Sequence, residues 1–204
     1  MDASYEEASW ANDELLCGID EAGLGCLAGS LFVGYVIFPK NYDFAVRLSK
    51  VNDSKKLSED TRFELAKLIK EDAVFWAVDK IDPDMVDERS GYHAVLDAIK
   101  NKTTTPALQN LRYSILFDGN HAVPGVDVIN KFLIKGDGKC YSIAAASILA
   151  KTQKDLEMIG LDLLCPQYNW KSNKGYGTKK HEAAILENGL TEFHRKTYCK
   201  KFIQ

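Results

Sequence analysis

Four acidic residues lie at the ends of predicted strands or in the loops that follow them. Asp20 and Glu21 follow a strand over 15–19. Asp118 follows a strand over 114–117, and Asp137 follows the next strand. Open α/β sheets place their sites at such strand ends. Carboxylates gathered at one edge repel one another and raise each other's pKa unless a cation lies among them.

The chemistry that this pattern favours is metal-assisted phosphoryl transfer. Hard carboxylate oxygens prefer Mg²⁺ or Mn²⁺ to Zn²⁺. Two such ions about 4 Å apart align an attacking water and stabilise the leaving oxygen of a phosphodiester. The residues therefore predict a two-metal site. The other interpretation is that each acid is a turn or capping residue, a common local role of aspartate.

Short apolar runs and helical stripes alternate along the chain and would position these acids. Apolar segments predict strands over 15–19, 31–38, 73–78, 114–117 and 126–134, of which 73–78 is expected to be buried. Helices are expected over 58–71, from Pro83 to Ile99, from Ser142 onward and near 182–187. The alternation predicts an α/β fold with a mixed central sheet flanked by helices. We expect one domain over 1–204, with a core at about 14–160 and a basic extension at about 161–204.

The charge of the chain is unevenly distributed. The net charge is −3, from 26 Lys and Arg against 29 Asp and Glu. Residues 131–204 alone hold 13 basic and 7 acidic residues, net +6. Together with Tyr176, these cations have the basic and aromatic character expected of a groove for a nucleic-acid backbone. The last third is therefore the predicted substrate surface.

Short motifs spread over most of the chain resemble those of the type 2 ribonuclease H family. They run in the family's order from Gly18 to Arg195: GIDEAG (18–23) with Gly25, DSKKLS (53–58), DGN (118–120), KGD (135–137), SIAAASILAK (142–151), KGYGT (174–178) with His181, and His194-Arg195. The resemblance implies a ribonuclease H-like fold with a small C-terminal helical extension. It also implies an endoribonuclease that cuts 5′ of a ribonucleotide, in RNA/DNA hybrids or in duplex DNA.

The resemblance assigns roles to particular residues. It implies that Asp20, Glu21, Asp118 and Asp137 hold two ions, Mg²⁺ or Mn²⁺, with Asp20 and Asp118 touching both. Expected substrate contacts are the loop Gly23, Leu24 and Gly25, the stacking ring of Tyr176, and Ser54, Lys55, Lys56, Lys174, His194 and Arg195. The Ser54–Lys56 segment precedes a predicted helix, where a hydroxyl, ammonium groups and free amides favour phosphate. A helix cap with two solvated lysines is the alternative there, as is a structural hydrogen-bonding role for His194.

Three positions depart from the family pattern. Leu24 stands where Arg or Lys is usual, Cys26 where Pro is usual, and Met85 where Asn is usual. Leucine cannot donate a hydrogen bond or pair with phosphate. One alternative is therefore a non-catalytic or weakly active hybrid-binding module on the same fold. Another is a metal-dependent DNA nuclease or resolvase of related fold.

Several other classes of protein are disfavoured by the sequence. The five cysteines form no C-x-x-C pair, which predicts reduced thiols and no zinc site. Neither G-x-G-x-x-G nor a Walker motif occurs, so no nucleotide cofactor is expected. The longest apolar run, 26–38, is too short to cross a membrane, and we expect a cytoplasmic protein. A monomer is expected because no heptad pattern occurs.

Overall fold

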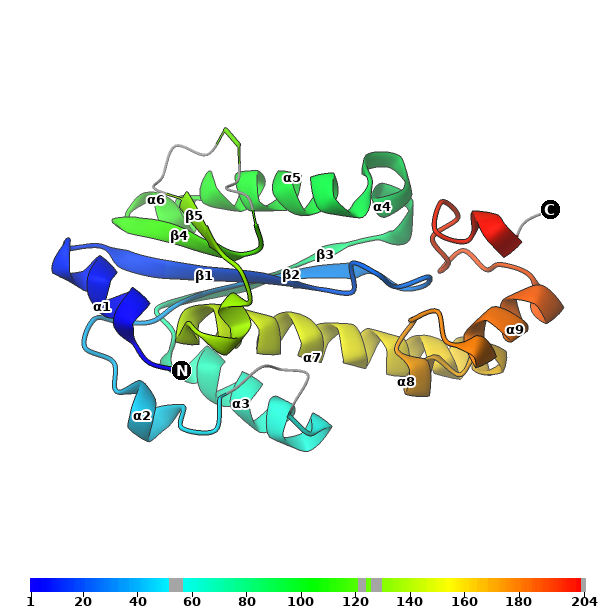
Figure 1. Cartoon of the computed structure of the whole chain (residues 1–204), viewed down its shortest axis with the longest axis horizontal. Helices are drawn as coiled ribbons and strands as arrows, with labels where there is room; N and C mark the ends of the chain where they lie inside the picture. Colours follow the sequence, from blue (N-terminus) through cyan, green and yellow to red (C-terminus); the bar gives the residue numbers. More distant parts are fainter. Residues whose placement is uncertain (52–56, 121–123, 126–129, 203–204) are drawn as a thin grey trace.

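A five-stranded mixed sheet forms the centre of the molecule (Figure 1). The structure is a computed structural model, and it describes residues 1–51, 57–120, 124–125 and 130–202. The strands are β1 (Leu15–Ala22), β2 (Leu31–Ile37), β3 (Phe75–Ile81), β4 (Tyr113–Asp118) and β5 (Asn130–Leu133), in the order β3-β2-β1-β4-β5. The first three strands pair antiparallel, and β1, β4 and β5 pair parallel. This confirms the predicted mixed sheet flanked by helices.

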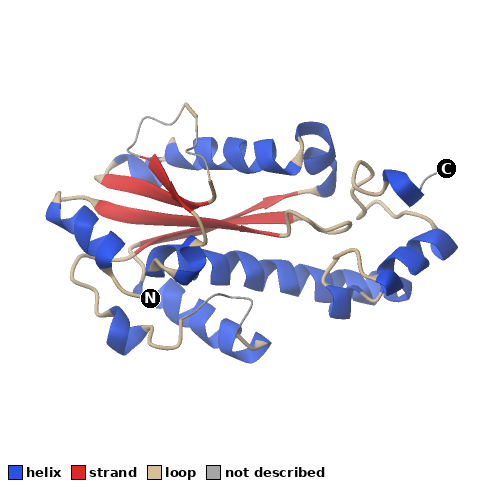
Figure 2. Cartoon of the chain, viewed as in Figure 1, coloured by secondary structure: helices blue, strands red, loops and turns tan. Residues whose placement is uncertain are grey.

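Helices cover both faces of the sheet and extend beyond one end of it (Figures 1 and 2). One face carries α4 (Pro83–Arg89) and α5 (Gly91–Thr103), and the other carries α3 (Glu59–Asp72) and α7 (Tyr141–Leu164). The remaining helices and turns are α1 (Ser4–Ala11), α2 (Phe44–Arg47), α6 (Pro106–Gln109), α8 (Trp170–Asn173), α9 (Lys179–Asn188), η1 (Gly136–Gly138), η2 (Pro166–Tyr168) and η3 (Lys200–Phe202). In the described part of the chain, no helix has the length and apolar character needed to span a membrane.

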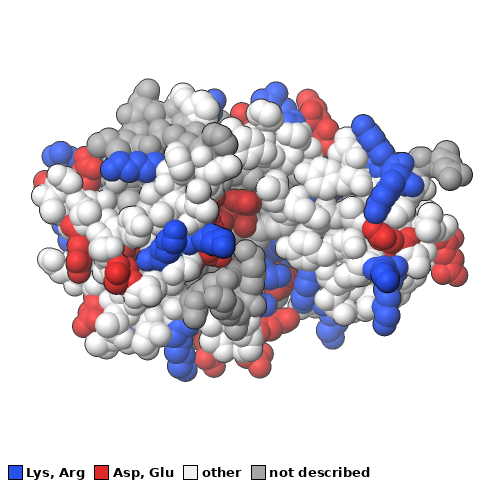
Figure 3. Space-filling view, in the orientation of Figure 1, with Lys and Arg blue, Asp and Glu red and all other residues white. Residues whose placement is uncertain are grey.

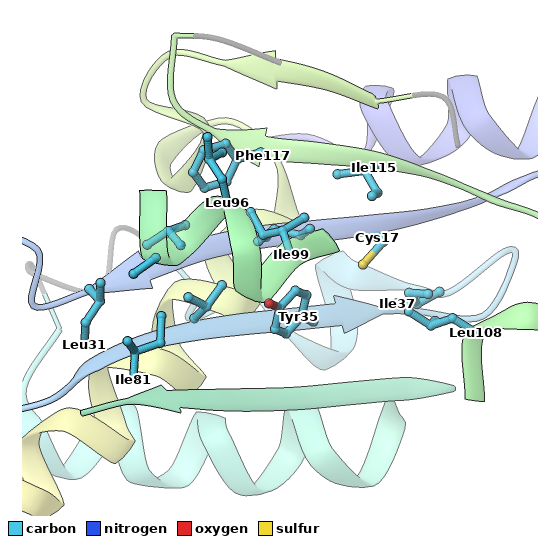
Figure 4. Close-up of a cluster of buried hydrophobic side chains, with 14 of the residues drawn as sticks. Cys17, Leu31, Tyr35, Ile37, Ile81, Leu96, Ile99, Leu108, Ile115 and Phe117 are labelled. Carbon is cyan, nitrogen blue, oxygen red and sulfur yellow. The ribbon is translucent and has the colours of Figure 1, made fainter. Parts of the chain in front are cut away.

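Apolar side chains form separate cores on the two faces. The cluster under α5 includes Tyr35, Ile99 and Phe117, which Figure 4 labels, and also Ile19. The cluster on the opposite face joins α3 to the alanine-rich first half of α7. Burial on both faces explains why β1 and β2 are almost continuously apolar in sequence.

Helix α7 lies unusually close to the sheet because two strand glycines leave room for it. A Cβ built on Gly18 would lie 2.1 Å from the carbonyl carbon of Ser142. One built on Gly34 would lie 2.2 Å from the carbonyl oxygen of Ala146. Real Cβ atoms do not approach backbone so closely, so both positions require glycine. The contact fixes where the first turns of α7 lie over β1 and β2.

The structure corrects several of the predicted elements. Strand β3 is an edge strand that is mostly half-buried, with Trp76 41% exposed, and the expectation of a buried strand over 73–78 was wrong. The helical segment after Pro83 is two helices, separated at Ser90, whose φ of 64° no α-helix continues. Asp20 and Glu21 lie within β1 rather than after it. Of the predicted strand 126–134, residues 126–129 lie outside the described part.

Besides the short helices α2, α6 and α8, two larger features were not predicted. Helix α1 precedes the sheet, and its Glu6 is buried against the start of α7, where the main-chain N–H of Ser142 donates to Glu6 Oε1 at 2.7 Å. An apolar cluster around Tyr168 and Trp170 packs α9 and the following loop against the second half of α7. The helix at 58–71 formed as expected, because Ser58 Oγ accepts the N–H of Thr61 as an N-cap.

Candidate active site

The parallel pairing of β1 with β4 brings Asp20 and Asp118 together. The register pairs Ile19 with Phe117, so the next residues along the two strands are Asp20 and Asp118. Both strands run in the same direction, and their carboxyl ends therefore meet at one edge. Strand pairing alone therefore makes Asp20 and Asp118 neighbours.

Asp137 joins the two strand aspartates from the short helix η1. This turn begins after Lys135, which has a left-handed backbone conformation, and its first N–H, on Gly136, donates to Asp118 Oδ1 at 3.0 Å. One carboxylate oxygen each of Asp20, Asp118 and Asp137 lies within 4.8 Å of the other two. Figure 3 shows a patch of acidic atoms near the middle of one face of the molecule, with basic side chains on either side.

Without a positive charge among them, the three carboxylates repel one another when they are ionised. Asp20 is 7% exposed, and burial together with the charges of Glu21 and Asp118 raises its pKa well above the ordinary value. A hydrogen bond from Ser147 on α7 partly opposes that rise. Oxygen donors that are close and mutually repulsive, two of the three on buried residues, fit a hard divalent cation such as Mg²⁺ or Mn²⁺. The residues present therefore suit the predicted metals.

Glu21 lies on the other side of the same strand. Successive side chains of a strand point to opposite faces, so Asp20 faces α7 while Glu21 faces α5. Glu21 lines a pocket of about 150 Å³ with Leu24, Tyr92 and Asp118 among its other walls. It is not part of the three-aspartate group, but the pocket places it beside one member of that group.

The glycine loop after β1 is held from below by Arg195. Its guanidinium donates to the carbonyl oxygens of Gly23, Leu24 and Gly29 at 2.7, 3.1 and 3.0 Å. Gly23 has a φ of 100° and lies buried against the stem of Lys154. Gly25 is exposed, and a Cβ built on it would have no atom within 4 Å. The main chain at Gly25 is thus open to a ligand.

Leu24 is half-buried and packs against the apolar cluster under α5. Its Cδ1 packs close to Gly91 at the start of α5, where Tyr198 also packs. Arginine or lysine at this position would have to leave that apolar contact to reach a charged group. At this departure from the family pattern, the side chain packs against apolar neighbours.

Tyr176 is presented by a loop between α8 and α9. Tyr176 is 41% exposed, and burial of its hydroxyl raises its pKa to about 12. The ammonium of Lys154, a fully buried residue of α7, lies 4.4 Å from the ring centroid and donates to the carbonyl of Lys174 at 2.7 Å. An isolated bridge pairs Tyr176 with Cys26 next to the glycine loop. Lys154 therefore supports both Tyr176 and the glycine loop.

The remaining predicted substrate residues do not all lie on the surface of the protein. Lys174 forms an ion pair with Glu59 of α3 at 3.3 Å. His194 and Arg195 are completely buried, so direct substrate contact by these two side chains was wrong for this structure, and both support the surface from beneath. Ser54, Lys55 and Lys56 lie outside the described residues. The cysteines are all free thiols, as predicted.

Sequence reasoning left Ser147 out of the predicted site residues and gave Lys154 no role in the site. Ser147 is a polar residue on an otherwise alanine- and isoleucine-rich face of α7, one turn beyond the contact with Gly18. Lys154 is a fully buried lysine in the middle of the same helix. A polar or charged residue inside an apolar helical stripe is the signal that would have found both. The adjacent Asp155 forms ion pairs with Arg62 and Lys151.

Comparison with known proteins agrees with this geometry. The family model for ribonuclease HII matches residues 17–201. The ribonuclease HII of Bacteroides fragilis is 43% identical over 194 residues, covering 93% of this chain and 92% of that protein. The ribonuclease HII of Chlorobium phaeobacteroides is 40% identical over 202 residues, covering 98% of both.

Solved structures show the same fold. The complex of PCNA and ribonuclease HII from Archaeoglobus fulgidus contains a chain with a TM-score of 0.72 and 26% identity, covering 93% of this chain and 97% of that one. The structure of Bst-RNase HIII in complex with Mn²⁺ has a TM-score of 0.69 at 19% identity, covering 93% of this chain and 69% of that one. The second likeness concerns the fold alone, which is ribonuclease H-like. From the family match and the identities to its relatives, this chain belongs to the ribonuclease HII family and is a ribonuclease H-type endoribonuclease.

Proposed function

We propose that this endoribonuclease hydrolyses the phosphodiester on the 5′ side of a ribonucleotide, using Mg²⁺ or Mn²⁺. The substrates are RNA/DNA hybrids and duplex DNA that contains ribonucleotides. The observation that carries the proposal is the grouping of Asp20, Asp118 and Asp137, with an oxygen of each within 4.8 Å of the others. A module that only binds nucleic acid has no use for three close carboxylates, two of them buried, beside a polyanion, because they would repel phosphate.

The proposed metal ligands are Asp20, Asp118, Asp137 and Glu21. When bound, two divalent ions supply a water of lowered pKa and stabilise the charge on the leaving oxygen. The hydrogen bonds from Ser147 to Asp20 and from the Gly136 N–H to Asp118 hold the two carboxylates in place for that purpose. The protein thereby avoids reorganising its ligands on each turnover.

The proposed substrate contacts lie on the side of the site nearest the C-terminal region. The half-exposed ring of Tyr176 offers a flat face to the sugar next to the ribonucleotide. The open main chain at Gly25 allows a close approach to the 2′-hydroxyl. Exposed lysines such as Lys179 and Lys196 would contact backbone phosphates without reading sequence. In this proposal residues 161–204 act as an extension of the 14–160 core that binds substrate. The phosphate contacts of Ser54, Lys55 and Lys56 remain predictions.

The test is cleavage of three end-labelled duplexes by the full chain. One carries a single embedded ribonucleotide, one is an RNA/DNA hybrid and one is all DNA. Each is incubated with Mg²⁺, Mn²⁺ or a chelator, with Asp118→Asn as the matched inactive control. We expect metal-dependent cutting 5′ of the ribonucleotide in the first duplex and cutting of the second, with the third intact.

Each other result changes the proposal in a defined way. Cutting of the hybrid alone would show that the loop with Leu24 does not select single ribonucleotides. Cutting of the all-DNA duplex would contradict the ribonucleotide requirement. Cutting in the presence of chelator, or full activity of Asp118→Asn, would contradict the metal site.

A further inference from the structure

Two completely buried histidines lie beneath Tyr176. His181 is in the first turn of α9, and His194 is in the loop that follows this helix. Their Nε2 atoms lie 3.3 Å apart. Tyr168 and Trp170 pack against both rings. Neither ring is exposed to a substrate, so their effect must pass through the groups that they contact.

The hydrogen bonds determine which nitrogen of each ring carries a proton. The main-chain N–H of Thr191 can only donate, and it lies 3.0 Å from His194 Nδ1. The indole N–H of Trp170 can only donate, and it lies 2.9 Å from His181 Nε2. Both of these ring nitrogens must therefore be acceptors. A neutral His194 then carries its proton on Nε2, and a neutral His181 carries its proton on Nδ1.

These tautomers also fit the contacts of the two other ring nitrogens, His181 Nδ1 and His194 Nε2. His181 Nδ1 lies 2.9 Å from the main-chain carbonyl oxygen of Tyr176, which can only accept. The protonated His194 Nε2 lies 3.3 Å from His181 Nε2, whose single lone pair it shares with the indole N–H of Trp170. The chain of donors runs from the Thr191 N–H through His194 and His181 to the Tyr176 carbonyl. Burial lowers the pKa of both imidazoles, which keeps the two rings neutral.

The same residues connect Tyr176 to the glycine loop. An isolated bridge pairs His194 with Ala28, and the neighbouring N–H of Arg195 donates to the carbonyl of Leu27. The Tyr176 carbonyl also accepts the N–H of Thr178, so both of its lone pairs are used. A carbonyl held from two directions leaves the peptide little freedom to rotate.

We propose that His181 and His194 are positioning residues that form a neutral hydrogen-bond relay holding Tyr176 in place for the substrate. The relay assigns neither histidine to proton transfer or to phosphate binding. The positioning role depends on the proposed function, in which Tyr176 contacts the sugar next to the ribonucleotide. The relay requires one particular tautomer of each histidine ring, and these tautomers can be measured without any substrate.

The first measurement is the tautomer of each histidine, from long-range ¹H–¹⁵N NMR spectra of the full chain at pH 7.5. We expect His181 protonated on Nδ1 and His194 protonated on Nε2. His181→Asn and His194→Asn variants assign the signals. The opposite tautomer at either ring, or a doubly protonated ring, would overturn the relay whatever the enzyme does.

The second measurement separates positioning from stability. His181→Asn retains an amide donor for the Tyr176 carbonyl, while His181→Leu does not, and both lose the acceptor for Trp170. We expect His181→Leu to raise KM for the single-ribonucleotide duplex about tenfold, which is the effect of losing one hydrogen bond. His181→Asn should have a KM close to that of the unaltered chain, whereas both variants should lower the melting temperature by a similar amount. Equal KM values in the two variants would contradict positioning.

A double-mutant cycle with Tyr176→Ala distinguishes failure of the relay from failure of the proposed function. If Tyr176→Ala raises KM, the effect of His181→Leu should largely vanish in the Tyr176→Ala background. Additive effects would show that His181 acts elsewhere and would refute the positioning role. An unchanged KM in Tyr176→Ala alone would refute the proposed role of Tyr176, while the NMR result would still decide the relay.

Discussion

The two regions that form the substrate surface are built in different ways. The aspartates come from paired strands and one adjoining turn, and the β1–β4 register alone makes Asp20 and Asp118 neighbours. Tyr176 comes from a loop between short helices, supported by buried side chains of Lys154, His181 and His194. The first region depends on main-chain pairing, and the second depends on side-chain hydrogen bonds.

This difference predicts which substitutions each region tolerates. Main-chain pairing is insensitive to side-chain identity, so the strand aspartates keep their places when one of them is changed. A buried side-chain network loses most of its value when one member is removed, because the partner is left unsatisfied. Ligand substitutions should therefore abolish chemistry and spare the fold, and substitutions beneath Tyr176 should affect both.

The largest effect is expected for Asp118→Asn. The amide keeps the shape and the hydrogen bond to Gly136 but removes a charge from the cation site. Loss of a metal ligand costs several kcal/mol of transition-state stabilisation, which corresponds to at least about a 10³-fold loss of kcat. The measurement is single-turnover cleavage of the single-ribonucleotide duplex. Binding of that duplex, followed by fluorescence anisotropy in chelator, should stay within a few-fold, and a loss of binding equal to the loss of kcat would contradict the separation of ligand from fold.

The next effect concerns the helix that covers the aspartates. Gly18→Ala would place a Cβ 2.1 Å from the Ser142 backbone, so α7 must shift away from β1. We expect a loss of about 3 kcal/mol or more in the free energy of unfolding, at the upper end of overpacking costs. Urea unfolding checks this. Gly160→Ala is the matched control, since a Cβ there meets no atom within 4 Å, and equal losses in the two variants would contradict the close contact of α7 with the sheet.

The third effect is a pH dependence that arises beneath Tyr176. Burial, together with the neighbouring His181, lowers the pKa of His194 from its ordinary 6.5 to about 4. Between these values the unfolded chain binds the proton and the folded chain does not, so the free energy of unfolding falls as pH falls from about 6.5 to 4. The slope is up to about 1.4 kcal/mol per pH unit for this group. The two imidazoles face each other and the ring of Tyr168. The charge of Glu182 raises the pKa of His181 and so opposes the effect of burial.

Urea unfolding of His194→Asn at several pH values between 7 and 4.5 measures that slope. The variant should be less stable at pH 7 and should lose less stability on acidification than the unaltered chain. His93→Gln, at an exposed histidine, is the control and should follow the unaltered chain. If the free energy of unfolding falls with pH equally in His194→Asn and in the unaltered chain, the lowered pKa of His194 is contradicted.

The same contrast explains what the sequence could predict. The grouping of the aspartates followed from strand ends, because local apolar runs show where strands lie and parallel strands end at one edge. Local patterns left His194 between a substrate contact and a structural role, and the burial of Arg195 could not be predicted, since both depend on the loop after α9 folding back onto Ala28 and Leu27. The edge position of β3 was missed for a related reason: an apolar run such as 73–78 carries no information on how many neighbours its strand will have.

The smallest effect is expected at the glycine loop, where Leu24 lies between the two regions. Leu24→Arg would exchange an apolar contact beside Gly91 for a cation close to the substrate backbone. One new phosphate contact should make the logarithm of the binding constant depend more steeply on the logarithm of the salt concentration, by about one unit. Affinity at low salt should rise only a few-fold, because the lost packing offsets part of the gain. Leu24→Met, which keeps the packing, should leave the slope unaltered, and equal slopes in the two variants would mean that the substrate backbone passes out of reach of position 24.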